Sequence, residues 1–320
     1  MIAPFKWQKL GQVFNPTEIK DRAFLKEFAQ APSTIIFDDF VRVYFSCRPA
    51  PDANGQYVSY SAFVDFDRSN FFSILRVSET PILELGDLGT FDEFGTYPVS
   101  VIKVGNEFFA YYGGWTRCYS VPFNVNIGIA ISRDDGKSFT RIGDGPVLSY
   151  TKDEPFILSS PKIRIFNGKF YLFYIAGKKW IIDEDKPEPV YRIRMAVSED
   201  GNNWTKIERD LISVVIEEDE AQASPDVFFM NGLFHMFFCY RHSKNYRNGE
   251  RGYRIGYASS RDLFNWKRDD LKAGISVSTV GWDSESISYP HIFTMDGNIY
   301  MIYLGNQVGK FGFGIAKLVM

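Results

Sequence analysis

Apolar and polar residues alternate in short stretches that recur along the chain at a nearly constant interval. Each of these stretches opens at a proline, and the prolines are Pro32, Pro98, Pro161, Pro225 and Pro290. Successive prolines lie 66, 63, 64 and 65 residues apart. A proline at the first position of a strand leaves no ladder hydrogen bond unmade. The regular interval indicates five structural repeats that together account for the whole chain.

Each repeat reads as two β-hairpins. Between the first two alternating runs lie turn pairs such as Asn167-Gly168, Asn231-Gly232 and Asp296-Gly297, which favour tight hairpin turns. Three repeats carry a second pair of runs around a short polar turn: IGIAISRDDGKSFTRI, YRIRMAVSEDGNNWTKI and YRIGYASSRDLFNWKRD. Four strands per repeat at this interval predict an all-β fold, a five-bladed β-propeller with four-stranded antiparallel blades.

The two ends of the chain predict how the ring closes. The last repeat ends in FGFGIAKLVM, which supplies a third strand and leaves no sequence for a fourth. The segment FKWQKLGQVF, residues 5–14, resembles the outer strands of the internal repeats. We therefore expect this N-terminal strand to complete the last blade. Because no linker interrupts the pattern, we expect a single domain over residues 1–320.

Composition narrows the choice of partners. The 320 residues are 45% hydrophobic and 23% charged, with a formal net charge of −3. No basic patch favours nucleic acid, and no apolar run approaches the roughly 18 residues that a membrane span needs. The N-terminus shows no secretory signal pattern, and three scattered cysteines suit neither a disulfide framework nor a metal cluster. We expect a cytoplasmic protein without metal or cofactor whose partner is neither nucleic acid nor a membrane.

The hairpin pattern also predicts where a site lies. Turns between the first and second strands, and between the third and fourth, share one face of a propeller, and here they are short. The opposite face carries the long polar and aromatic loops GGWTRCYSVPFNVN, AGKKWIIDEDKPEPV and CYRHSKNYRNGERG, together with the approaches to each proline. Long loops on a rigid scaffold are the usual place for binding residues.

Acidic residues precede the blade prolines in these long loops. They are Glu27, Glu93, Glu220 and Glu285, five residues before a proline, with Glu154, Asp92 and Asp283 at nearby offsets. Equivalent blades would bring them together near the axis, where cations, hydrogen bonds or substrate hydroxyls must offset their repulsion. Paired carboxylates suit glycosidic bond chemistry, in which one protonates the leaving oxygen and the other activates water or attacks carbon. Alternatively, each glutamate caps a turn or pairs with an arginine.

The predicted catalytic carboxylates are Glu285, Glu220, Asp92, Glu154 and Asp226. Because Glu285 and Glu220 share an offset in adjacent repeats, we expect them to approach one another across the mouth of the site. Their separation would distinguish a retaining from an inverting mechanism.

Basic and aromatic residues of the same loops are the predicted substrate-binding residues. They are Gln30, Trp115, Arg117, Trp180, Arg241, His242, Tyr246, Arg254, Trp282 and Asp283. Tryptophans stack on the apolar faces of sugars, and arginines bind carboxylates or phosphates bidentately, which favours an acidic or phosphorylated carbohydrate. The alternative is that the arginines neutralise the loop carboxylates. We expect His235 to be structural and His291 to project toward the axis.

Segments such as SPKIRIFNGKFYLFY and SPDVFFMNGLFHMFF resemble the five-bladed glycosidases of families 43, 32 and 68 and the phosphorylases of family 130. The segments LGDLGTFDEFGTYPVSV and GWDSESISYPHIF resemble, more closely, glycosidase-related proteins of bacterial polysaccharide gene clusters, and this resemblance covers nearly the whole chain. It implies a propeller that acts on a bacterial surface glycan or its precursor.

One departure from the resemblance affects the chemistry. Family 43 has an Asp directly before the first blade proline as general base and a Glu two residues before a blade proline as acid. Here the residues directly before the prolines are Ala31, Tyr97, Ser160, Ser224 and Tyr289. Those two before are Gln30, Thr96, Ser159, Ala223 and Ser288. Three interpretations therefore remain open: a glycoside hydrolase or transferase with its acids further back in the loops, a phosphate-dependent phosphorylase, and a non-catalytic glycan-binding propeller.

Overall fold

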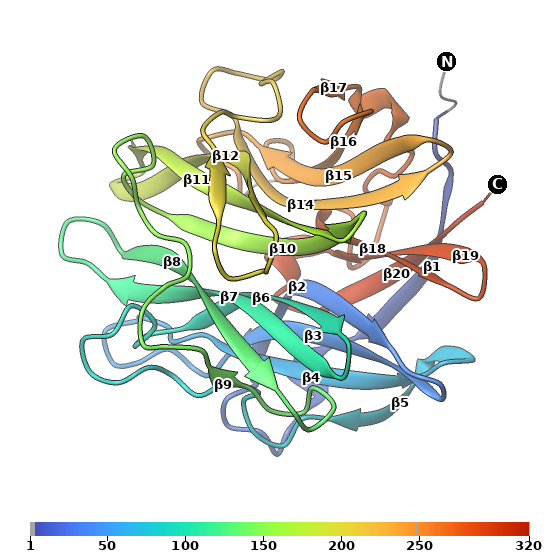
Figure 1. Cartoon of the computed structure of the whole chain (residues 1–320). Helices are drawn as coiled ribbons and strands as arrows, with labels where there is room; N and C mark the ends of the chain where they lie inside the picture. Colours follow the sequence, from blue (N-terminus) through green and yellow to red (C-terminus); the bar gives the residue numbers. More distant parts are fainter. Residues whose placement is uncertain (1–3, 248, 320) are drawn as a thin grey trace.

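The computed structural model describes residues 4–247 and 249–319, and in it the chain forms five four-stranded antiparallel sheets arranged in a ring (Figure 1). The predicted five-bladed β-propeller is therefore confirmed. The first three blades contain β2(Glu27–Ile36), β3(Phe40–Arg48), β4(Tyr60–Asp67), β5(Asn70–Val77); β6(Thr96–Val104), β7(Glu107–Arg117), β8(Phe123–Ser132), β9(Thr140–Arg141); and β10(Leu158–Phe166), β11(Lys169–Asp183), β12(Lys186–Ser198), β13(Thr205–Ile207). The last two contain β14(Ala221–Met230), β15(Leu233–Arg241), β16(Arg254–Ser260), β17(Trp266–Arg268); and β18(Ser288–Met295), β19(Asn298–Leu304), β20(Phe313–Leu318), β1(Trp7–Phe14).

Within residues 4–247 and 249–319, helical structure occurs only in short segments between strands. These are the 3₁₀ turns Pro16–Glu18 and Asp270–Lys272 and the short helix Asn306–Gly309. In the described part of the chain, no helix has the length and apolar character needed to cross a membrane.

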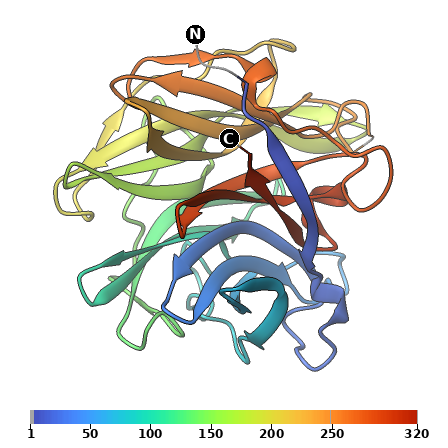
Figure 2. The same cartoon turned by 90° about the vertical axis from the view of Figure 1, so that its right-hand side faces the viewer.

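The N-terminal strand closes the ring as the sequence predicts. Strand β1 pairs antiparallel with β20, from Trp7 opposite Leu318 to Phe14 opposite Phe313. Figure 2 shows the blue β1 lying beside the red strands of the last blade. Residues from the two ends of the chain thus share one sheet, and the edge that the last repeat leaves open is covered.

Every inner strand is irregular just before its proline. The residue before the proline has a positive φ in four blades: Ala31 (51°), Ser160 (50°), Ser224 (48°) and Tyr289 (51°), and in the remaining blade the Tyr97-Pro98 bond is cis. The pairing register with the second strand shifts at this point in each blade. Bulges of this kind turn a side chain away from its regular direction, and non-glycine residues with positive φ concentrate at functional sites.

Tyrosines of the second strands tie neighbouring blades together. Tyr44 donates its hydroxyl to the carbonyl of Gly136 (2.9 Å), and Tyr111 donates to the carbonyl of Gly201 (2.6 Å), each in the outer turn of the next blade. Gly136 has φ +72°, and a Cβ there would lie 2.1 Å from the Tyr44 hydroxyl, so the turn requires glycine. Buried apolar residues of adjacent blades pack between these ties.

Candidate functional site

A cavity of about 1200 Å³ opens on the face that carries the long loops. Its lining comes from the β3–β4, β7–β8, β15–β16 and β19–β20 loops, from the start of β12, and from the segments that enter the inner strands. The tight turns between first and second strands and between third and fourth strands, such as Asn167-Gly168 and Asp200-Gly201, do not contribute to the lining. The cavity therefore lies on the face where the hairpin pattern predicts a site.

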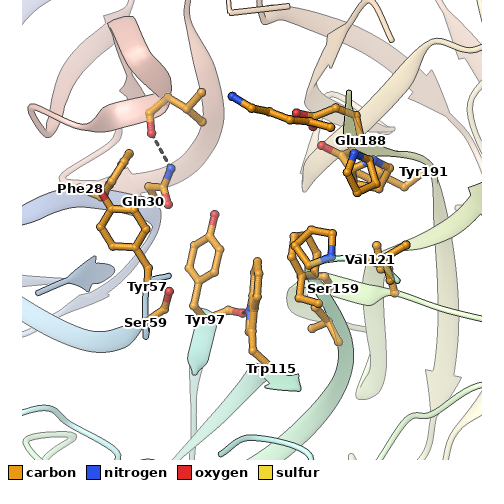
Figure 3. A pocket seen from close by; sticks show the side chains of 18 of the residues that line it. Phe28, Gln30, Tyr57, Ser59, Tyr97, Trp115, Val121, Ser159, Glu188 and Tyr191 are labelled. Atoms are coloured by element: carbon orange, nitrogen blue, oxygen red, sulfur yellow. Dashed lines mark hydrogen bonds between the residues drawn. The ribbon is translucent and has the colours of Figure 1, made fainter. Parts of the chain in front are cut away.

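Aromatic side chains form much of the wall. They are Phe28, Tyr57, Phe94, Tyr97, Trp115, Tyr119, Phe123, Tyr191, Tyr246, Tyr253 and Tyr289. In Figure 3, Tyr57 and Gln30 lie on one side, Glu188 and Tyr191 lie on the other, and Tyr97 and Trp115 stand between them. Flat apolar rings edged with hydroxyl groups suit the alternating apolar faces and polar rims of sugar rings.

Basic residues outnumber acidic residues in the lining, although the whole chain is net negative. The basic residues are Arg48, Arg117, Lys186, Arg241, Arg247 and Lys310, and the acidic residues are Glu188 and Glu285. Three of the cations are paired: Arg117 with Asp52 (3.1 Å), Arg247 with Glu188 (2.6 Å) and Lys310 with Glu27 (3.3 Å). The excess positive charge favours an anionic group in the cavity.

Arg48, at the end of β3, holds its guanidinium against three aromatic rings. The guanidinium carbon lies 4.6 Å from the ring centre of Phe28, 5.3 Å from that of Tyr57 and 5.6 Å from that of Tyr97. Its Nε donates to the Ser59 hydroxyl (3.2 Å). Neither terminal nitrogen has an acceptor, and no carboxylate pairs with Arg48, among residues 4–247 and 249–319. These free donors suit bidentate contact with a carboxylate or a phosphate.

Arg241, at the end of β15, is buried in the opposite wall without a carboxylate partner among the described residues. Its guanidinium lies 3.6 Å from the ring centre of Tyr246. It donates to the Tyr253 hydroxyl (3.2 Å), the His242 carbonyl (2.9 Å) and the Pro189 carbonyl (3.1 Å). Neutral oxygens thus hold a full positive charge in the cavity wall.

The two carboxylates of the lining differ in their surroundings. Glu188 is buried and accepts hydrogen bonds from Arg247 (2.6 Å) and the Tyr246 hydroxyl (2.9 Å). Glu285 is exposed, and its carboxylate has no partner among the described residues. The Asn306 side chain accepts from the Glu285 backbone N–H (2.8 Å), and Arg254 donates to the Glu285 carbonyl (2.9 Å), so the backbone at Glu285 is fixed while the side chain is free.

A charged cluster around the propeller axis lies below the cavity. Asp226 is fully buried and contacts Arg164, His291 (2.7 Å) and Lys162 (3.9 Å). Burial alone would raise the pKa of Asp226, but these neighbours outweigh burial and lower it. Burial and the nearby Lys162 lower the pKa of His291 to about 3, and burial lowers that of Lys162 to about 8.

The axial contacts also assign the histidine tautomer. The Thr34 backbone N–H donates to Nε2 of His291 (3.0 Å), so Nδ1 carries the proton and donates to Asp226. His291 projects toward the axis as expected. Asp226 is saturated with partners and does not line the cavity, so its predicted catalytic role remains a prediction without a contact to support it.

Four of the predicted loop carboxylates are buried within their own blades. These brace carboxylates are Asp92, Glu154, Glu220 and Asp283. Each pairs with a cation of the outer strand of its blade: Arg141 (2.7 Å), Lys206, Arg268 (2.5 Å) and Lys9 (2.6 Å), in that order. Three of them also accept from a tyrosine of the second strand: Tyr112 (2.8 Å), Tyr174 (2.8 Å) and Tyr303 (3.0 Å).

This arrangement differs from the predicted convergence of carboxylates. The equivalent residues lie six, seven, five and seven positions before the prolines, so a constant offset of five does not select them. Glu220 is buried against Arg268 and lies outside the cavity lining, which separates its role from that of Glu285. The brace carboxylates thus have the surroundings of the structural alternative, in which a glutamate pairs with a basic residue. Their catalytic roles remain predictions.

The predicted binding residues divide between the lining and its support. Gln30, Trp115, Arg117, Arg241 and Tyr246 line the cavity. Outside the lining, Trp180 packs against Phe123 with ring centres 5.6 Å apart, and Trp282 packs against Tyr303 at 5.2 Å. His242 contacts Glu217 (2.8 Å), and Arg254 supports the Glu285 backbone.

Several cavity residues were not predicted from the sequence, namely Arg48, Tyr57, Glu188, Tyr191 and Tyr253. Arg48 is the last residue of the second strand of its blade, as the predicted Arg241 is in its own blade. This equivalent position in the repeat could have identified Arg48 from the sequence. Tyr191 and Tyr253 lie near the starts of third strands, where no turn or proline marks them. Within the described residues, no group of three or more histidine, cysteine or carboxylate side chains has the arrangement to hold a metal ion.

Comparisons with known proteins place the chain in a class. A scan of protein-family models found no match. The uncharacterized protein Rv1502 of Mycobacterium tuberculosis is 34% identical over 98% of this chain and 99% of its own length. A β-1,2-mannobiose phosphorylase of Thermoanaerobacter is 28% identical over 40% of this chain and 44% of its own length.

Solved structures show the same fold. A glycoside hydrolase structure matches 98% of this chain and 92% of its own with a TM-score of 0.74 and 16% identity. The β-1,2-mannobiose phosphorylase from Listeria innocua matches 98% of this chain and 96% of its own with a TM-score of 0.68 and 12% identity. The fold is that of the glycosidase-like five-bladed propellers. The chain belongs to the same family as Rv1502 of M. tuberculosis.

Proposed function

We propose that the protein binds an acidic or phosphorylated carbohydrate in this cavity and cleaves or transfers one of its glycosidic bonds. The observation that carries the proposal is a wall of tyrosine and tryptophan rings combined with two arginines, Arg48 and Arg241, that have no carboxylate partner in the described structure. The rings suit the sugar and the guanidinium groups suit its anion. The resemblance to proteins of bacterial polysaccharide clusters favours a bacterial surface glycan or its precursor as the substrate.

Glu285 is the carboxyl group best placed for proton transfer. It lines the cavity and has no described side-chain partner, whereas Arg247 and Tyr246 engage Glu188. A substrate oxygen can therefore meet the Glu285 carboxyl group directly, whereas two donors already occupy the oxygens of Glu188. We assign Glu285 the role of acid toward the leaving oxygen and Glu188 a positioning role.

The proposal is tested with a panel of acidic glycans and glycosyl phosphates, with products separated by anion-exchange chromatography. Once a substrate is found, Glu285→Gln is expected to keep the fold and to lower turnover on the order of a hundredfold or more. Glu250→Gln is the matched control, because Glu250 is exposed and lies outside the lining. Unchanged turnover in a folded Glu285→Gln protein would remove the assigned acid.

Phosphorolysis is the second candidate, and the charge distribution of the cavity favours it. Inverting hydrolysis needs a second carboxylate to activate water, yet Glu188 is tied to Arg247. Inorganic phosphate is itself a nucleophile, needs no base and binds to arginine. The partial similarity to a mannobiose phosphorylase supports the same idea. Phosphorolysis predicts a sugar phosphate product that forms only when phosphate is added.

A glycan-binding propeller is the remaining alternative. It predicts saturable binding of a panel member with no product under either condition. Binding measured with wild-type protein and product analysis with and without phosphate together separate the three functions.

A further inference from the structure

A chain of hydrogen bonds runs from the buried Arg241 through two tyrosines to the cavity. Arg241 Nε donates to the Tyr253 hydroxyl (3.2 Å), and the Tyr253 and Tyr191 hydroxyls lie 2.6 Å apart. All three side chains are buried and all three contribute to the cavity lining. They come from three different strands or loops: the end of β15, the residue before β16, and β12.

The hydrogen-bonded series Arg241–Tyr253–Tyr191 contains one proton that none of its own contacts uses. The guanidinium N–H and the two hydroxyls bring three protons, while the two contacts between them use only two. No other acceptor for either hydroxyl exists among the described residues. The 2.6 Å contact allows either hydroxyl to donate. When Tyr253 donates to Tyr191, the remaining proton is that of the Tyr191 hydroxyl, and a negative ligand oxygen beside Tyr191 selects this direction because it accepts that proton.

The neighbouring charge strengthens this last donor. Consecutive hydrogen bonds polarise one another, and the first donor here is a guanidinium, which stays protonated in proteins. No carboxylate neutralises Arg241 within the described residues. A negative ligand oxygen near Tyr191 would therefore gain both a hydrogen bond and attraction to a charge in a wall shielded from water.

We infer that the Tyr191 hydroxyl is the terminal donor of an oxyanion-binding site, in which Tyr253 and Arg241 act as positioning residues. The site takes an anionic oxygen of phosphoryl or carboxylate chemistry. This inference rests on the proposed function for its setting, because it names how the same cavity recognises an anion. It does not depend on bond cleavage and is measured without turnover.

The test uses full-length protein carrying ¹³C at the Cζ of tyrosine, titrated at neutral pH with inorganic phosphate, glucuronate and glucose. The Tyr191 resonance, identified by its loss in Tyr191→Phe, is expected to shift with one or both anions and not with glucose. Tyr191→Phe should weaken anion binding by on the order of tenfold, as loss of a hydrogen bond to a charged group does. A shift with phosphate alone indicates phosphoryl recognition, and a shift with glucuronate alone indicates a carboxylate sugar.

A second variant tests the hydrogen-bonded series from Arg241 through Tyr253 to Tyr191. Tyr253→Phe preserves ring packing but breaks the link to Arg241, so the Tyr191 resonance should move in the ligand-free protein and anion affinity should fall several-fold. Tyr111→Phe is the matched control, because its hydroxyl bonds to Gly201 away from the cavity, and it should bind anions as the wild type does.

Two results overturn the inference: an unmoved Tyr191 resonance with both anions, or equal anion affinity in Tyr191→Phe and wild type. Both measurements can be repeated in Glu285→Gln, which retains the anion site. Failure of the oxyanion site and failure of the assigned catalytic acid are therefore distinguishable.

Discussion

The brace carboxylates and Glu285 originate in equivalent loops but meet opposite surroundings. Asp92, Glu154, Glu220 and Asp283 are at most 3% exposed, and each pairs with a cation of its own blade. Glu285, two residues after Asp283, is exposed in the cavity without a described partner. A shift of two residues thus separates a carboxylate that holds a blade together from one that is available to a ligand.

The protein pairs the charges inside its blades and leaves two positive charges of the cavity without a carboxylate partner among the described residues. Buried carboxylates pair with cations because an uncompensated charge in the interior is strongly destabilising. The cavity reverses this rule, since Arg48 and Arg241 lack carboxylate partners in the described structure. Charge left unpaired on rigid blades is a feature expected of a binding site, because a ligand then supplies the missing partner.

Removing one brace should give the largest effect. Glu154→Gln leaves Arg194 and Lys206 without their shared carboxylate, and loss of one partner of a buried ion pair costs about 3–5 kcal/mol. We expect the melting temperature to fall by about 5 °C or more, measured by scanning calorimetry. Tyr174→Phe, which removes one neutral donor to Glu154, should cost about 1 kcal/mol. Equal melting temperatures for Glu154→Gln and wild type would contradict the structural role of the braces.

Acid should destabilise the axial cluster by an intermediate amount. The pKa of His291 is about 3 in the folded protein and about 6.5 when unfolded. Between these values the unfolded state binds more protons, so the free energy of unfolding falls as pH drops below 6.5. At pH 5 this loss amounts to about 2 kcal/mol.

Urea unfolding at pH 7 and pH 5 measures this contribution. His291→Gln should be less stable at pH 7, because it disturbs the contacts to Asp226 and Thr34, but should show a smaller difference between the two pH values. An unchanged pH difference in His291→Gln would show that His291 is not the group responsible.

The smallest effect on stability is expected at Glu285. Because its carboxylate forms no hydrogen bond or ion pair with a described residue, Glu285→Gln should change the free energy of unfolding by less than about 0.5 kcal/mol. Urea unfolding of Glu285→Gln and Glu154→Gln in parallel measures the difference in free energy of unfolding between the two kinds of carboxylate. A loss comparable to that of Glu154→Gln would mean that Glu285 is a brace as well.

The sequence predicted the fold more completely than it predicted the residues of the cavity. Prolines at a constant interval and Asn-Gly turns are local signals, and they led to the blades and to closure by residues 5–14. The braces also have a local signal that was not used: an aromatic residue two positions before the basic one, in Trp7/Lys9, Phe139/Arg141, Trp204/Lys206 and Trp266/Arg268. This repeated pair identifies the cation that each loop carboxylate meets.

The cavity has no comparable signal, because its residues come from different blades. Arg48, Tyr191 and Arg241 lie in three blades, and only the closed ring brings them to one space. Of the predicted catalytic carboxylates, Glu285 alone lines the cavity within the described residues, while the prediction treated the loop acids as equivalent.

The sequence by itself determined the repeat, the strand order and the face that carries the long loops, because alternation, turns and proline positions act over a few residues. The tertiary structure decided which charged side chains form ion pairs and which have no oppositely charged partner among the described residues. That choice depends on distances between residues far apart in the chain, such as Lys9 and Asp283 at 2.6 Å, and on the absence of such a partner for Arg48 among the described residues. The Coulombic energy of two charges changes severalfold with a few ångströms of separation and with burial. The same residue types therefore form ion pairs within a blade in one place and stay open to a ligand in another.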